Sequence, residues 1–77
     1  MTTKALLRKR LGVAIGKTVT PKDFTWFFDY FCEKNPTYAP LKRAKNLDAN
    51  AVDAFSRFAG YDLRFPIPLP LLNPFLT

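Results

Sequence analysis

Positively charged side chains are the groups in this sequence best suited to bind a charged partner. Lysine and arginine donate charge-assisted hydrogen bonds to phosphate and carboxylate oxygens, which gives them affinity for nucleic acids and for acidic protein surfaces. We therefore predict contact with an acidic surface, of which nucleic-acid phosphates are one form, without reading of bases. The candidate residues are Lys4, Arg8, Lys9, Arg10, Lys17, Lys42, Arg43 and Lys45.

The net charge of the 77-residue chain is concentrated at one end. Lysine and arginine number 12 against 6 aspartate and glutamate residues, which gives a formal charge of +6. Residues 1–22 hold six of the cations and no acid, so residues 23–77 hold the other six cations and all six acids. This asymmetry predicts a basic N-terminal segment on an electrically neutral body.

Catalytic and metal-binding chemistry has little support in the residue types. The sequence has no histidine, the commonest metal ligand and general base, and its one cysteine excludes an internal disulfide. The spacing of Asp29 and Glu33 is explained by a solvated helix face, and Cys32 is interpreted as a buried structural thiol. Three residues separate Gly12 from Gly16, whereas a phosphate-binding loop has four. We predict a protein that is not an enzyme, with no cofactor, metal ion or small-molecule substrate.

A second group of side chains is suited to bind another protein. Trp26 and Tyr30 lie beside the polar face of a predicted helix, where they either extend the buried face or form an exposed aromatic pair. The apolar residues from Phe65 onward need a surface, which is either the protein's own core or the groove of a neighbouring chain. The candidate protein-binding residues are Trp26, Tyr30, Phe65, Ile67, Leu69, Leu71, Leu72 and Phe75.

Three helices are predicted to position these residues, in an all-α fold. Apolar residues at positions 7, 11, 14 and 15 recur with helical spacing over residues 3–16, a segment that Gly16 ends. Thr20 caps a helix over residues 20–34, whose phenylalanines at 24, 27, 28 and 31 form one apolar stripe. Asp48 caps a third helix, which Gly60 ends. Residues 36–47 are expected to form a loop with space for a short helical turn.

The last part of the chain cannot continue the helices. Pro66, Pro68 and Pro70 lack an N–H and fix φ at about −65°, which predicts an extended segment that can pair along one edge only. The predicted organisation is a small basic three-helix domain over residues 1–64, followed by an extended proline-rich C-terminal tail over residues 65–77.

The composition also bounds the class of protein and its location. Hydrophobic residues make up 48% of the chain, too many for a disordered polyelectrolyte. The longest uncharged apolar stretch, residues 65–72, is far shorter than the roughly 20 residues of a membrane-spanning helix, and no secretory signal is evident. We expect an intracellular location, in the cytoplasm or within a virion.

Together these features favour a non-enzymatic small subunit or adaptor of a larger assembly. Its basic N-terminal helix would contact an acidic surface and its tail would dock on another protein chain, a division of roles typical of virion proteins, ribonucleoprotein subunits and phage proteins. One alternative is a small helical DNA-binding regulator, although a third helix with Asp48, Asp53 and Arg57 is a poor reading face. The other is a phage-type inhibitor that occupies the groove of a partner protein.

Overall fold

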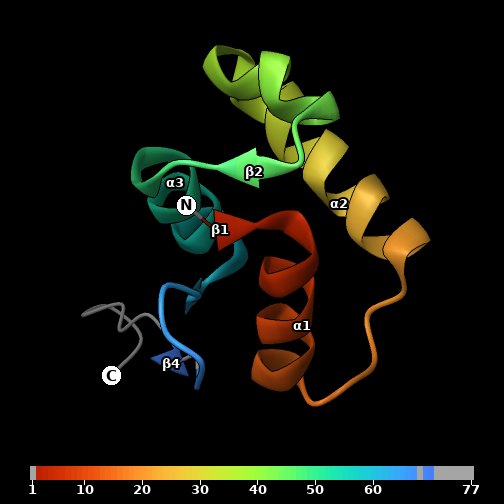
Figure 1. Cartoon of the computed structure of the whole chain (residues 1–77), viewed down its shortest axis with the longest axis vertical. Helices are drawn as coiled ribbons and strands as arrows, with labels where there is room; N and C mark the ends of the chain where they lie inside the picture. The colour runs from red at the N-terminus through yellow and green to blue at the C-terminus, as the bar shows by residue number, and fades with distance from the viewer. Residues whose placement is uncertain (1, 68, 71–77) are drawn as a thin grey trace.

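Helices account for most of the chain in the computed structural model, which describes residues 2–67 and 69–70 (Figure 1). The helical fold class is confirmed, and the described residues add two short antiparallel strand pairs that were not predicted. Residues 68 and 71–77 of the predicted tail lie outside the described residues. In chain order the elements are β1 (Thr2–Thr3), α1 (Lys4–Ile15), α2 (Pro21–Lys34), the 3₁₀ helix η1 (Pro36–Arg43), β2 (Asn46–Leu47), α3 (Ala49–Ala59), β3 (Tyr61–Asp62) and β4 (Leu69–Pro70).

Side-chain caps start α2 and α3 at the residues that the sequence indicates. Thr20 Oγ1 accepts a hydrogen bond from the Asp23 N–H (3.1 Å), and Asp48 Oδ1 accepts one from the Ala51 N–H (2.8 Å). Each bond satisfies a backbone donor that the first helical turn leaves unpaired. Both predicted caps are therefore confirmed.

Glycines end α1 and α3 in the left-handed conformation. Gly16 has φ 71° and Gly60 has φ 87°, and their N–H groups bond back to the carbonyls of Gly12 and Ser56. A residue with a Cβ is strained at such φ values, whereas glycine is not. Both predicted helix ends are confirmed.

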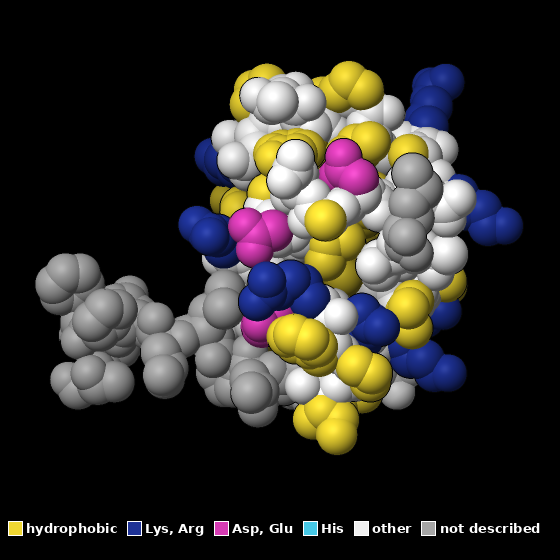
Figure 2. Space-filling view, turned by 60° about the vertical axis from the view of Figure 1, so that its left-hand side comes forward, with side chains coloured by type: hydrophobic (Ala, Val, Ile, Leu, Met, Phe, Trp, Pro, Cys, Tyr) yellow, Lys and Arg dark blue, Asp and Glu magenta, His cyan; other side chains and the backbone are white. Residues whose placement is uncertain are grey.

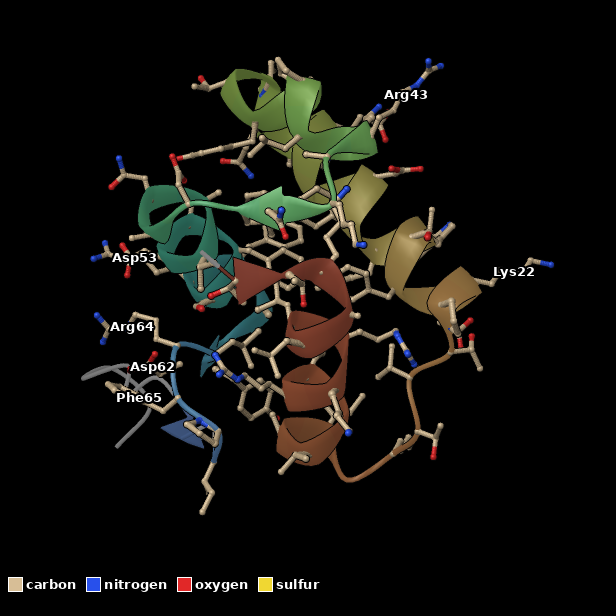
Figure 3. All side chains as sticks on the ribbon, viewed as in Figure 1. Lys22, Arg43, Asp53, Asp62, Arg64 and Phe65 are labelled. Carbon is tan, nitrogen blue, oxygen red and sulfur yellow. The ribbon has the colours of Figure 1, made fainter. Side chains whose placement is uncertain are left out.

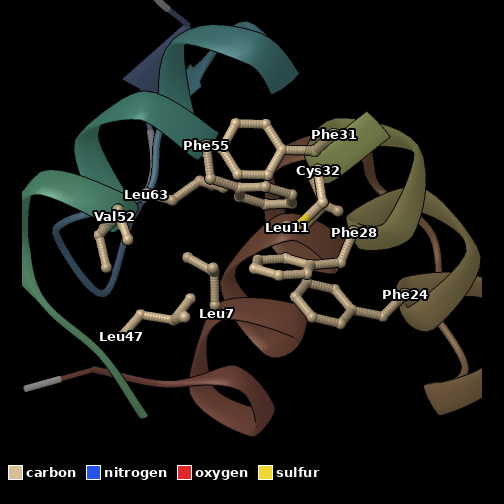
Figure 4. Packing of buried hydrophobic residues seen from close by; sticks show 11 residues of the cluster. Leu7, Leu11, Phe24, Phe28, Phe31, Cys32, Leu47, Val52, Phe55 and Leu63 are labelled. Atoms are coloured by element: carbon tan, nitrogen blue, oxygen red, sulfur yellow. The ribbon is translucent and has the colours of Figure 1, made fainter. Parts of the chain in front are cut away.

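Phenylalanine rings from α2 and α3 form the centre of the core (Figure 4). Phe55 of α3 is fully buried, and its ring centroid lies 5.3–5.7 Å from those of four phenylalanines of α2. The predicted stripe therefore faces the core, with Phe27 half-buried at its edge. The other large buried side chains around it are Leu7, Leu11, Leu47 and Leu63.

Residues 36–43 form a 3₁₀ helix rather than a loop with a short turn. Helices of this type are usually three or four residues long, so eight residues need support from elsewhere. Tyr38 stacks on Phe31 with 5.5 Å between ring centroids, and Lys4 Nζ donates hydrogen bonds to the carbonyls of Leu41 (2.6 Å) and Lys42 (2.7 Å). These contacts come from distant parts of the sequence, which explains why the local pattern did not reveal the helix.

The two strand pairs join segments that are far apart in the sequence. β1 pairs with β2, with Thr2 opposite Leu47, and this pairing sets the start of α1 beside the end of η1. β3 pairs with β4, with Tyr61 opposite Pro70 and Asp62 opposite Leu69. The second pair holds the chain that follows the three helices against the end of α3 (Figure 1).

Alanine at position 12 is expected to destabilise the protein although alanine favours helices. Its Cβ would lie 2.8 Å from the backbone oxygen of Lys17, because the chain after α1 folds back against Gly12. Helix propensity gains about 1 kcal/mol, whereas overpacking costs about 1–3 kcal/mol. We expect Gly12→Ala to lower the free energy of unfolding by about 1 kcal/mol in urea denaturation.

The matched control is Ala5→Gly, an exposed site in the same helix where propensity alone acts. It should lower the free energy of unfolding by about 1 kcal/mol. A Gly12→Ala protein more stable than the parent would show that the chain does not approach Gly12 this closely.

Candidate interaction surface

Three cations of α1 are used inside the fold. Besides Lys4, which supports η1, Arg8 Nη1 donates a hydrogen bond to the Val19 carbonyl (2.7 Å) and Arg10 Nη1 donates one to the Leu63 carbonyl (3.1 Å). These bonds tie α1 to backbone that lies 11 to 53 residues away in the sequence. The basic N-terminal helix therefore presents fewer free cations than its sequence indicates.

Two further cations are held in ion pairs on the surface. Arg57 Nε lies 3.3 Å from Asp53 Oδ2, and Arg64 Nη2 lies 2.8 Å from Asp62 Oδ2 (Figure 3). The hydrogen bonds from Arg64 lower the pKa of the Asp62 carboxyl below its usual value. Both pairs are open to solvent, so their contribution to stability is small.

The remaining seven cations are exposed and form no ion pair within residues 2–67. Two of them, on α2, were not among the predicted binding residues, and five were. In Figure 3, Lys22 and Arg43 project outward on the same side of the view, and Figure 2 shows lysine and arginine side chains along one edge of the molecule. The seven are Lys9, Lys17, Lys22, Lys34, Lys42, Arg43 and Lys45.

The fold brings the start of α1 against the second cationic cluster. The Lys4 N–H donates to the Lys45 carbonyl (3.0 Å), and Lys4 Nζ reaches the carbonyl of Lys42. The amine also lies 4.3 Å from the centroid of the Phe28 ring. Burial lowers the pKa of this amine, while Cys32 and Asp29 act in the opposite direction.

Cys32 is buried and is not placed for chemistry. Its Sγ–H donates to the Tyr38 carbonyl at 3.2 Å, and burial raises the pKa of the thiol above its usual value. Because the thiolate is the reactive form, this environment keeps the sulfur unreactive at neutral pH. No group of histidine, cysteine and acidic residues that could hold a metal ion occurs in the described part of the chain.

Trp26 and Tyr30 form an exposed aromatic pair rather than part of the core. Their rings stack at 10° with 5.9 Å between centroids, and the Trp26 side chain is 69% exposed. Tyr30 packs against Phe58, and Lys34 Nζ lies 5.5 Å from the centroid of the Tyr30 ring. The 3₁₀ helix covers Phe31 instead, which leaves the pair without a cover among the described residues.

Trp26 forms one wall of an apolar groove of about 430 Å³ between the end of α1, the start of α2 and the end of α3, hereafter the Trp26 groove. Ile15, which was expected on the buried face of its helix, is exposed and lines this groove. The charged residues of the lining are Lys17 and Asp23, so the groove is electrically neutral. Ala59 closes the side toward α3.

A second groove, of about 770 Å³, runs between α1 and residues 16–19. Arg8, Lys9 and Lys17 line it together with exposed Leu6 and Val13, and the lining holds no acid. We call it the cationic groove. Since α1 also buries Leu7 and Leu11, this helix is apolar on two faces, a pattern typical of helices that are covered on both sides.

The candidate residues of the tail are only partly described. Phe65 and Ile67 are exposed, and Leu69 lies in β4, where its backbone pairs with Asp62. Leu71, Leu72 and Phe75 lie outside the described residues.

Four residues of the two surfaces were missed by the sequence analysis. Leu6 and Val13 lie next to the predicted core positions of α1, and a test for apolar residues on both helix faces would have revealed them. Lys22 and Lys34 flank the aromatic pair on α2 at intervals of four residues, so their spacing was also a usable signal.

Comparisons with known proteins give no family for this chain. No protein-family model, no curated protein and no solved structure gives a significant match. Among the described residues, no helix is both long enough and apolar enough to span a membrane. The argument for function therefore rests on the surfaces themselves.

Proposed function

We propose that this protein is a non-enzymatic small subunit or adaptor that docks on another protein of a larger assembly. The observation that carries the proposal is the exposed Trp26 side chain on the wall of a neutral apolar groove. Exposed tryptophan and tyrosine side chains are enriched among the residues that dominate protein–protein binding energies. An apolar segment of a partner chain fits the Trp26 groove.

Charge supports a second contact, with an acidic surface. Seven exposed cations have no ion-pair partner among residues 2–67, and the cationic groove contains three cations without an acid. Such a surface attracts carboxylates or phosphates over long distances and speeds association. The acidic surface is a partner protein or the phosphates of a nucleic acid, and in either case the contact is sequence-independent.

The exposed side chains of the tail provide a third apolar surface. Phe65 and Ile67 are 56% and 75% exposed. Side chains of this kind bury apolar area when a partner covers them. We assign them to docking on the same assembly.

Trp26→Ser is expected to weaken docking about tenfold without changing the helical circular dichroism spectrum. The tagged protein and the variant are used to capture partners from native extract, and the captured protein is then purified and titrated against both. Val13→Ser, a matched change of an exposed side chain in the cationic groove, is the control for the Trp26 groove. Equal binding of the captured protein by the parent protein and Trp26→Ser would refute docking through this groove.

A further inference from the structure

The pairing of β4 shows where the chain after Pro70 leads. In an antiparallel pair the residue numbers run in opposite directions, and here Leu69 lies opposite Asp62 and Pro70 opposite Tyr61. The chain after Pro70 therefore heads back along Gly60 toward Ala59. Ala59 lines the Trp26 groove, so the direction of β4 carries residues 71–77 toward the edge of that groove.

The length of this segment is sufficient to cross the groove. Two residues bring the chain from the level of Tyr61 to that of Ala59, and residues 73–77 follow. Five extended residues span roughly 17 Å. Phe75 and Leu76 lie in this part and supply the large apolar side chains.

The chemistry of the segment matches this groove and not the other one. Residues 65–77 contain no charged side chain, and Lys17 and Asp23 leave the Trp26 groove neutral. The cationic groove offers three cations to a segment that has no acid to pair with them. Proline-rich segments with few N–H donors bind grooves lined by aromatic side chains, and the stacked Trp26 and Tyr30 rings provide such a wall.

The tether favours the segment of the same chain over that of a second copy. A segment linked by a few residues is present at an effective concentration of about millimolar. Two copies of a chain with a net charge of +6 also repel each other.

We propose that residues 71–77 occupy the Trp26 groove of their own chain in the free protein, so that a docking partner must displace them. This inference rests on the proposed function of the groove as a docking surface, and it adds the regulation of that surface. Displacement would free the groove and the tail together, which couples the two protein contacts.

The only tryptophan of the chain reports directly on this contact. Acrylamide quenching of Trp26 fluorescence is measured for the full chain, for a chain that lacks residues 71–77, and for the full-length variant Phe75→Ser/Leu76→Ser. Because a covered tryptophan loses a large part of its accessible area, the quenching constant should rise roughly twofold in both altered proteins. Circular dichroism checks that all three proteins keep the same helix content.

A peptide of residues 65–77, added to the shortened chain, should restore protection only at about millimolar concentration. Equal quenching constants in the three proteins would overturn the proposal. Protection that appears only with rising protein concentration, together with a doubled mass in light scattering, would assign the segment to a second copy and would also overturn it. The quenching assay needs no partner, so its result is independent of whether Trp26→Ser affects docking.

Discussion

Phe55→Ala is expected to leave much of the protein unfolded at 25 °C. Phe55 has no exposed surface, and its ring packs against those of Phe24, Phe27, Phe28 and Phe31. It is the residue of α3 at which the whole aromatic stripe of α2 converges. Removing this ring leaves a cavity bordered by four other rings, which cannot all close on it.

The size of the effect decides the outcome. Phenylalanine-to-alanine changes in a core cost about 3–5 kcal/mol, and a chain of this length has a total stability of roughly 4–12 kcal/mol. Urea denaturation followed by circular dichroism measures the loss. The matched control is Phe65→Ala, an exposed phenylalanine whose removal should change the free energy of unfolding by less than about 0.5 kcal/mol. Equal stability of the two variants would mean that Phe55 is not the centre of the core.

Lys4→Met should lower the free energy of unfolding by about 2 kcal/mol, because it removes the charge and keeps most of the apolar stem. The Lys4 amine donates hydrogen bonds to the Leu41 and Lys42 carbonyls at the end of η1 and lies over the Phe28 ring. Hydrogen bonds from a charged group contribute about 1.5–3 kcal/mol each in favourable cases, and a cation at a helix C-terminus adds to them. Burial, which lowers the pKa of this amine, offsets part of that gain.

The control for this variant is Lys9→Met, which removes an exposed cation of the same helix without an internal partner among the described residues. Its free energy of unfolding should change by less than about 0.5 kcal/mol. Amide hydrogen exchange gives a second measurement, since Lys4→Met should raise exchange rates most strongly in residues 36–43. If Lys4→Met and Lys9→Met were equally stable, Lys4 would be one more solvated surface cation.

Several features of the fold could be read from local patterns. Thr20 and Asp48 are caps because a side-chain oxygen three residues before a free N–H is a local arrangement, independent of the rest of the chain. The phenylalanine stripe and the two helix-ending glycines also follow from spacing within one helix. The 3₁₀ helix and the strand pairs were missed because each depends on contacts with residues far away in the sequence.

The candidate site divides in the same way. Residue types and net charge were enough to predict a cationic chain with an exposed or buried aromatic pair and no catalytic groups. Which cations are free was decided only by the tertiary structure, because Lys4, Arg8 and Arg10 find carbonyl groups that folding brings to them. The exposure of Trp26 was decided there too, since the 3₁₀ helix packs on Phe31 and leaves the other side of α2 open. The sequence by itself determined the charges and the helices, and the long-range packing determined which of these groups face a partner.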